Sequence, residues 1–341
     1  SILCSEILFR LIMFCLYGKY YLYKIKPYYL VDNKFTGYEL RHNLNSKNIS
    51  FRLFEKYAFP PNTKPSFSLL ENIDKRVCFT TNNYGLRSSY IKLLPNKENT
   101  FRIACSGGST TVGQGINDNE TWPYQLGKEF ELNGEDVEII NGGVYGYSSY
   151  QELISIKKKL IQFKPKVLLI HQGWNEEFNF SSLDLGKNFK PKQARKYYES
   201  YFFFCNNIAF FPRYLLSIIL ILRKFRRNRL LDGKMQFSNP KRWQVLLNPD
   251  YLKAWFENII EIQKICHKYS IKLFLIKYPS LVNISDSEKN RSTYIKSSRL
   301  TSHHAEYQAI AKARIDEMLS LISPYFNIID ADSDFNKFQN K

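Results

Sequence analysis

From residue 101 onward the chain alternates short apolar segments with longer amphipathic segments, and this alternation constrains the fold more than any other feature. The apolar segments have the length of strands, and apolar residues dominate both of their faces. Such strands, separated by helices, predict a parallel sheet that is covered by helices on both sides. The predicted strands are FRIACS, VEIING, KVLLIHQG, IKLFLIKYP and FNIIDAD, and the predicted helices span residues 120–134, 148–163, 251–269 and 303–322.

The helix predicted at 148–163 carries signals for its start and for its buried face. Ser148 or Ser149 can cap its N-terminus, because a serine hydroxyl accepts a hydrogen bond from the first helical N–H groups. The apolar side chains that share one face, and that we expect to be buried, are Tyr150, Leu153, Ile154, Leu160 and Ile161.

Three segments lie outside this alternation. Residues 1–30 open with an apolar stretch that Glu6 and Arg10 interrupt, so it is shorter than the roughly 20 apolar residues of a spanning helix. It fits either the end of a membrane anchor or signal segment, or an amphipathic surface helix. Residues 31–100 are rich in turn residues and are predicted to be an irregular extension. Residues 177–250 are predicted to be an insertion, whose apolar run LLSIILIL and basic run RKFRRNR fit either a flap that touches lipid or an acyl chain, or a buried helix with a solvated basic end.

Composition narrows the class of partner. The formal net charge is +18 and the pI is about 9.4, which alone would suit a nucleic acid or a membrane surface. The basic residues are scattered, however, and Lys is accompanied by many Asn, Ile and Tyr residues, as in proteins encoded by AT-rich genomes. We therefore predict no nucleic-acid partner. The six cysteines form no CxxC or zinc-type spacing, so we predict no metal site.

Three predicted strands end in sequences that suit nucleophilic catalysis. Ser109 lies in GGSTT after the first strand, Gly143 and Gly146 lie in NGGVYGYSS after the second, and Gly173 and Asn175 lie in GWNEE after the third. Carboxyl ends of parallel strands meet at one edge of a sheet, so we expect these residues to lie together. A serine on a tight turn can be a nucleophile, and backbone N–H groups and an Asn amide can stabilise an oxyanion.

In order and spacing, these motifs resemble the blocks of the SGNH (GDSL-type) hydrolase family over residues 79–176. GGSTT resembles the first block in its GGST form, NGGVYGYSS the second, and GWNE the third, with Glu176 in place of the usual Asp. The resemblance implies an α/β fold for residues 101–341, a three-layer α/β/α sandwich around a parallel five-stranded, flavodoxin-like sheet. It also implies that Ser109 is the nucleophile, and that its own N–H, the Gly146 N–H and the Asn175 side chain form the oxyanion hole.

The family's fourth block, an Asp-x-x-His that supplies the general base, is missing. Asp330 and Asp332 follow the last predicted strand, but no histidine comes after them. Three interpretations stay open. His303 or His304 supplies the base, with His304 as our candidate; or the chain is a fragment that lacks its true N-terminus and stops at Lys341 before the block; or the protein has no base.

Two aromatic side chains near the third strand end also have two interpretations each. His171 either lines the site or is a histidine whose hydrogen bonds are satisfied at the strand end. Trp174 either forms a wall of the pocket or packs in the core.

The sequence thus predicts a serine esterase or deacylase that works through an acyl-serine intermediate without a cofactor or a metal. The alternatives are an O-acyltransferase acting on cell-envelope sugars, and a catalytically inactive binding module at a membrane. The expected partners are an acylated small molecule, glycan or lipid, and a membrane surface. We expect a membrane-anchored protein of the bacterial cell envelope, with the cytoplasm as the alternative; the acyl substrate and the oligomeric state stay open.

Overall fold

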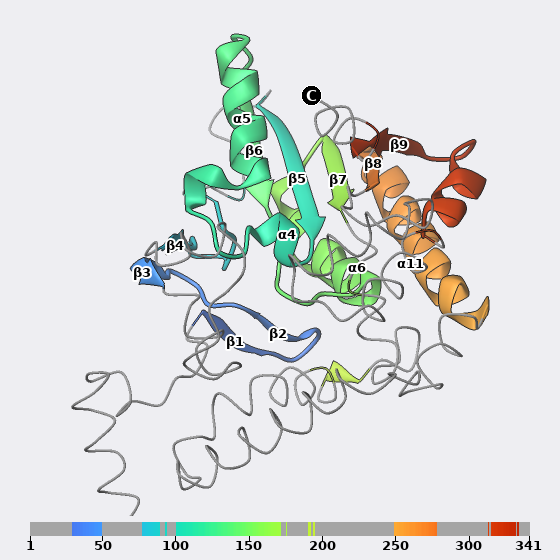
Figure 1. The fold of residues 1–341 in the computed structure, drawn as a ribbon, viewed down its shortest axis with the longest axis horizontal. Helices are drawn as coiled ribbons and strands as arrows, with labels where there is room; N and C mark the ends of the chain where they lie inside the picture. Colours follow the sequence, from blue (N-terminus) through green and yellow to red (C-terminus); the bar gives the residue numbers. More distant parts are fainter. Residues whose placement is uncertain are drawn as a thin grey trace, which may run out of the picture.

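The computed structural model of the chain describes a central sheet, the helices that cover it and two N-terminal pairs of antiparallel strands (Figure 1). The described residues are 29–49, 77–88, 93, 100–171, 175, 190–191, 194, 249–277, 313, 315–331 and 333. Most of the predicted N-terminal segment at 1–30 and of the predicted insertion at 177–250 lies outside them. Within the described part of the chain, no helix combines the length and the apolar character needed to cross a membrane.

The central sheet has five parallel strands in the order β6-β5-β7-β8-β9. The first of them in the chain therefore lies between the second and the third, which is the flavodoxin-like order. The predicted fold class is confirmed, and each strand lies within or next to its predicted segment. The strands are β5 (Phe101–Gly107), β6 (Val137–Asn141), β7 (Val167–His171), β8 (Lys272–Lys277) and β9 (Asn327–Asp330).

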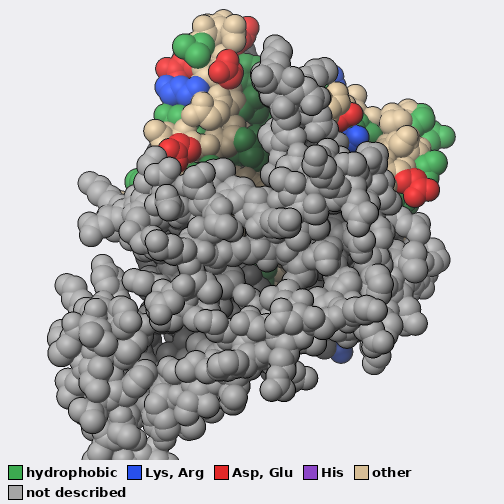
Figure 2. Space-filling model, in the orientation of Figure 1, with side chains coloured by type: hydrophobic (Ala, Val, Ile, Leu, Met, Phe, Trp, Pro, Cys, Tyr) green, Lys and Arg blue, Asp and Glu red, His purple; other side chains and the backbone are tan. Residues whose placement is uncertain are grey.

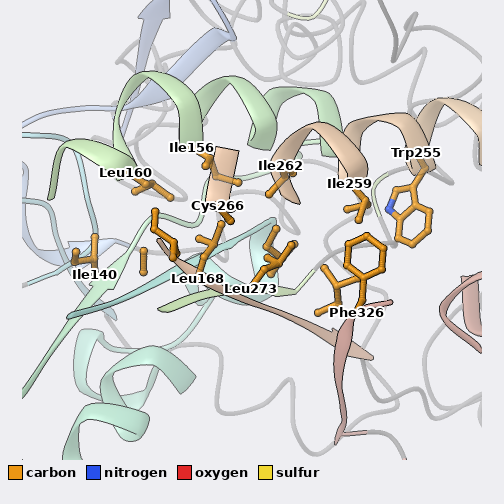
Figure 3. Packing of buried hydrophobic residues seen from close by; sticks show 14 of the residues in the cluster. Ile140, Ile156, Leu160, Leu168, Trp255, Ile259, Ile262, Cys266, Leu273 and Phe326 are labelled. Carbon is orange, nitrogen blue, oxygen red and sulfur yellow. The ribbon is translucent and has the colours of Figure 1, made fainter. Parts of the chain in front are cut away.

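Helices cover both faces of this sheet, because alternate strand residues point to opposite sides. Helix α5 (Trp122–Leu132) packs on Ile103 and Cys105. On the other face, Ala104 joins a core with α6 (Ser149–Lys158), α11 (Pro249–Lys268) and the helical residues 315–322 (Figure 3). The outer end of α5 is exposed, and acidic, basic and hydrophobic side chains lie together there (Figure 2).

Helix α6 begins where the sequence predicts, and it buries polar residues as well as apolar ones. Ser148 is its N-cap and forms a capping box with Gln151. Of the predicted face, Leu160 is buried and Leu153 and Ile161 pack against the core. Tyr150 and Ile154 are half-buried, whereas polar residues of the first turn are buried. The buried polar groups bond to distant segments, so the local pattern could not reveal them. Gln151 Nε2 donates to the Thr36 carbonyl at 2.8 Å, and Asn258 Nδ2 donates to Ser149 Oγ at 2.9 Å.

The region 31–100, predicted to be irregular, contains two antiparallel strand pairs, of which the first is a hairpin. One pairs β1 (Leu30–Asn33) with β2 (Gly37–Leu40), and the other pairs β3 (Asn45–Ile49) with β4 (Val77–Thr80). The strands were missed because they are short and become buried only against the loop that follows β6. An aromatic cluster forms that contact, made of Tyr29, Tyr38, Phe79, Tyr145 and Tyr147.

An ion pair joins the first hairpin to the end of α6. The Lys159 ammonium contacts the Glu39 carboxylate and also donates to the Tyr84 carbonyl at 2.9 Å. Burial alone would raise the pKa of Glu39, but the attraction of Lys159 and the hydrogen bonds from Lys159 and Asn33 outweigh it. The pKa of Glu39 therefore lies below its ordinary value, and the carboxylate is ionised at neutral pH.

A buried arginine connects strand β4 to the helical turn that follows β5. Arg87 Nε donates to Asp118 Oδ1 at 2.8 Å, and Nη1 donates to the Val112 carbonyl at 2.6 Å. Its Nη2 donates to the Ile116 carbonyl at 2.7 Å, and the guanidinium lies 4.3 Å above the Phe79 ring. The Arg87 side chain thus hydrogen-bonds to both ends of residues 112–118, the segment that leads out of α4.

We expect Arg87→Leu to lower the free energy of unfolding by about 3 kcal/mol, because buried carbonyls and Asp118 lose their donor. Urea denaturation measures the change. The control is Lys264→Met, which removes an exposed ion pair with Glu261 and should leave stability unchanged. Equal stability of the two variants would contradict the role given to Arg87.

Candidate active site

Ser109 lies on a tight turn between a strand and a helix. Strand β5 ends at Gly107, and α4 (Ser109–Val112) begins two residues later, with Gly108 at φ −87° and ψ −145° between them. The Ser109 carbonyl accepts the N–H groups of Gly113 and Gln114, which closes the turn. Ser109 is half-buried at the carboxyl edge of the sheet. A serine on such a turn presents its hydroxyl where a substrate can approach.

The turn requires glycine at position 107, because neighbouring segments leave no room there for a side chain. A Cβ on Gly107 would lie 2.0 Å from Thr111 Oγ1 and 2.6 Å from the His171 carbonyl oxygen. A Cβ on Gly143 would lie 2.4 Å from the Val112 backbone nitrogen. The loop after β6 therefore packs directly on α4, and Gly143 serves this close approach.

The loop after β6 is hydrogen-bonded to the turn along its length. The Gly142 N–H donates to the Cys105 carbonyl at 2.8 Å, and the Val144 N–H donates to the Gly107 carbonyl at 3.0 Å. Asn141, which our sequence analysis missed, donates from Nδ2 to the Thr111 carbonyl at 3.0 Å and is buried. A polar side chain at the end of an apolar strand was the signal that could have revealed it.

Asn175 lies over the residue that precedes Ser109. Its Nδ2 is 2.2 Å from the position that a Cβ on Gly108 would occupy. The same nitrogen donates to the Tyr147 carbonyl at 2.9 Å, so the amide also touches the loop after β6. Gly146 lies in that loop with φ +66°, a conformation that glycine adopts without strain. The structure thus brings the three strand-end motifs together, as predicted.

His171 is held at the end of β7 by two neighbours. Its Nδ1 is 3.2 Å from Thr110 Oγ1, and the Trp122 ring meets the imidazole edge-on at 6.1 Å between centroids. Burial lowers the pKa of His171 to about 4, so the ring is neutral at neutral pH. These contacts agree with the interpretation of a satisfied strand-end histidine, next to the residue that follows Ser109.

Several predicted site residues lie outside the described residues, namely Gly173, Trp174, Glu176, His303, His304 and Asp332. Asp330 is described, at the end of β9, where its Oδ1 accepts the Ser333 N–H at 3.0 Å and its Oδ2 lies 3.6 Å from Lys277 Nζ. Among the described residues, no group of three or more His, Cys, Asp or Glu side chains could hold a metal ion.

No family model and no curated protein matches the chain. Solved structures do resemble it. TesA is 12% identical over 60% of this chain and 73% of its own, with a TM-score of 0.30. A GDSL-like lipase from Bacteroides thetaiotaomicron is 16% identical over 67% of each chain, with a TM-score of 0.26. AlinE4, an SGNH-hydrolase family esterase, is 15% identical over 67% of this chain and 96% of its own, with a TM-score of 0.29. At identities and TM-scores this low, the likeness supports no conclusion about function.

The contact between Gly108 and Asn175 predicts a coupled pair of substitutions. We expect Gly108→Ala to cost about 1 to 3 kcal/mol of stability, because the new methyl group meets the Asn175 amide. Asn175→Ala should relieve this cost by at least about 0.5 kcal/mol in the double variant. Gly107→Ala is the control, because its methyl group meets Thr111 and the His171 backbone, and Asn175→Ala should not relieve it. Additive costs for Gly108→Ala and Asn175→Ala would contradict the contact.

The low pKa of His171 predicts how stability depends on pH. Between pH 6.5 and about pH 4, His171 binds a proton in the unfolded chain but stays neutral in the folded protein. The free energy of unfolding therefore falls as the pH falls. Urea denaturation across this range should show a smaller loss in His171→Gln than in the wild type. A wild-type pH dependence in His171→Gln would contradict the lowered pKa of His171.

Proposed function

We propose that this protein is a serine ester hydrolase in which Ser109 is the nucleophile. The observation that carries the proposal is the position of the Asn175 amide over Gly108, beside the strand-to-helix turn that presents Ser109. An amide nitrogen has two N–H donors. The bond to the Tyr147 carbonyl uses one and orients the amide plane, which leaves the other for a substrate oxygen.

In the proposed mechanism, Ser109 Oγ attacks the carbonyl carbon of an ester and the carbonyl oxygen becomes an oxyanion. The N–H groups of Ser109 and Gly146 and the Asn175 amide donate to this oxyanion, which lowers the barrier because the charge forms only in the transition state. The alcohol leaves, and water then attacks the acyl-serine to release the acid and restore Ser109.

A general base must take the proton from Ser109 and give it to the leaving alcohol in the first step, and take a proton from water and return it to Ser109 in the second. The sequence candidate for this base is His304, which lies outside the described residues. The oxyanion donors and the nucleophile make their contribution whichever group supplies the base, so they can be tested separately from it.

We expect Ser109→Ala to abolish hydrolysis of p-nitrophenyl acetate, and Asn175→Ala to lower kcat/KM by about 100- to 1000-fold, because one oxyanion donor is lost. Circular dichroism should show that both variants stay folded. Asn119→Ala, at an exposed position in the 3₁₀ helix η3 (Asp118–Glu120), is the control and should keep full activity.

A second measurement traps the nucleophile itself. A fluorophosphonate should add one phosphonyl group to Ser109, located by mass spectrometry of the digested protein, and Ser109→Ala should stay unlabelled. Full activity of Asn175→Ala, or labelling that persists in Ser109→Ala, would refute the proposed function. Faster release of p-nitrophenol on addition of a sugar acceptor would instead favour the acyltransferase alternative, which shares the acyl-serine.

A further inference from the structure

The peptide unit between Tyr145 and Gly146 links a proposed oxyanion donor to the first hairpin. A trans peptide unit is planar, so its C=O and its N–H point in opposite directions. The N–H of this unit belongs to Gly146, and its carbonyl belongs to Tyr145. A group that fixes the Tyr145 carbonyl therefore also fixes the direction of the Gly146 N–H.

The Tyr38 hydroxyl contacts this carbonyl. It donates to the Tyr145 oxygen at 2.9 Å, in a buried contact between residues 107 positions apart in the chain. Tyr38 is only 5% exposed. Its ring meets the Tyr147 ring edge-on at 5.5 Å between centroids, and the Tyr147 hydroxyl donates to the Tyr38 carbonyl at 2.6 Å. Both the ring and the backbone of Tyr38 are thus held in place.

The hydrogen bond from Tyr38 matters because glycine at position 146 permits the peptide unit to rotate. A peptide unit can rotate by about 180° when the ψ before it and the φ after it change together, and glycine accepts φ of either sign. Gly146 has φ +66°. A rotated unit would direct its N–H away from its present side, whereas the hydrogen bond from Tyr38 holds the carbonyl and opposes the rotation.

We propose that Tyr38 is a positioning residue for catalysis, which acts through the Tyr145–Gly146 peptide on the oxyanion. This inference rests on the proposed function. The hydrogen bond to the carbonyl also polarises the peptide unit, which makes its N–H a stronger donor. The first hairpin therefore acts on the proposed oxyanion hole through the Tyr145–Gly146 peptide.

Tyr38→Phe tests the role, because it removes the hydroxyl and keeps the ring. We expect kcat for p-nitrophenyl acetate to fall about tenfold, less than for the loss of a whole donor, while KM stays unchanged. Lys159→Met is the control. It breaks the ion pair that docks the same hairpin on α6, so it should lower stability and leave kcat unchanged. Equal losses of kcat in the two variants, or a change confined to KM, would overturn the role of Tyr38.

Nuclear magnetic resonance observes the peptide unit directly. With ¹³C-carbonyl tyrosine and ¹⁵N-glycine, only Tyr–Gly pairs give a coupled signal, and the sequence has three, at residues 17–18, 84–85 and 145–146. We expect Tyr38→Phe to move the Tyr145 carbonyl resonance upfield and to leave the Tyr84 signal in place. An unmoved Tyr145 signal would overturn the inference even if the wild type is active. Absence of Ser109-dependent hydrolysis in the wild type would refute the proposed function, and with it the catalytic role of Tyr38.

Discussion

The close approach of backbones at the carboxyl edge of the sheet is the constraint on which the candidate site depends. Gly107 and Gly143 have no room for a side chain, and Gly108 lies directly beneath an amide nitrogen. Because these positions lack a Cβ, the turn after β5, the loop after β6 and Asn175 can meet within contact distance. The hydrogen bonds from Asn141 and Asn175 then lock segments that the glycines allow to approach.

The sheet could be predicted from the sequence because its signal is local. Each strand is an apolar run, and its neighbours follow from the alternation with helices. The strand ends could also be predicted, since Ser109 and Asn175 stand directly after such runs and parallel strands share an edge. The resemblance to a known family added the roles of these residues, which residue types and spacing alone leave open.

The N-terminal strand pairs and the buried polar residues of α6 could not be predicted, because distant segments determine them. Gln151 is polar and buried, and its partner is the Thr36 carbonyl, 115 residues earlier in the chain. The same holds for Arg87, whose acceptors include the distant carbonyls of Val112 and Ile116. A pattern within one segment cannot reveal a hydrogen bond to another, so these residues look like ordinary turn and surface positions until the chain is folded.

The bond between Tyr38 and Tyr145 has a consequence for the order of folding during synthesis. A two-stranded hairpin is at best marginally stable alone, so the first hairpin becomes stable only after later segments, among them the loop after β6, have been synthesised. That loop leaves the ribosome 107 residues later, which is roughly 5 to 20 s at ordinary rates of translation. The aromatic side chains of the hairpin stay accessible to chaperones throughout this interval, and the loop acquires its final geometry only when the hairpin packs against it.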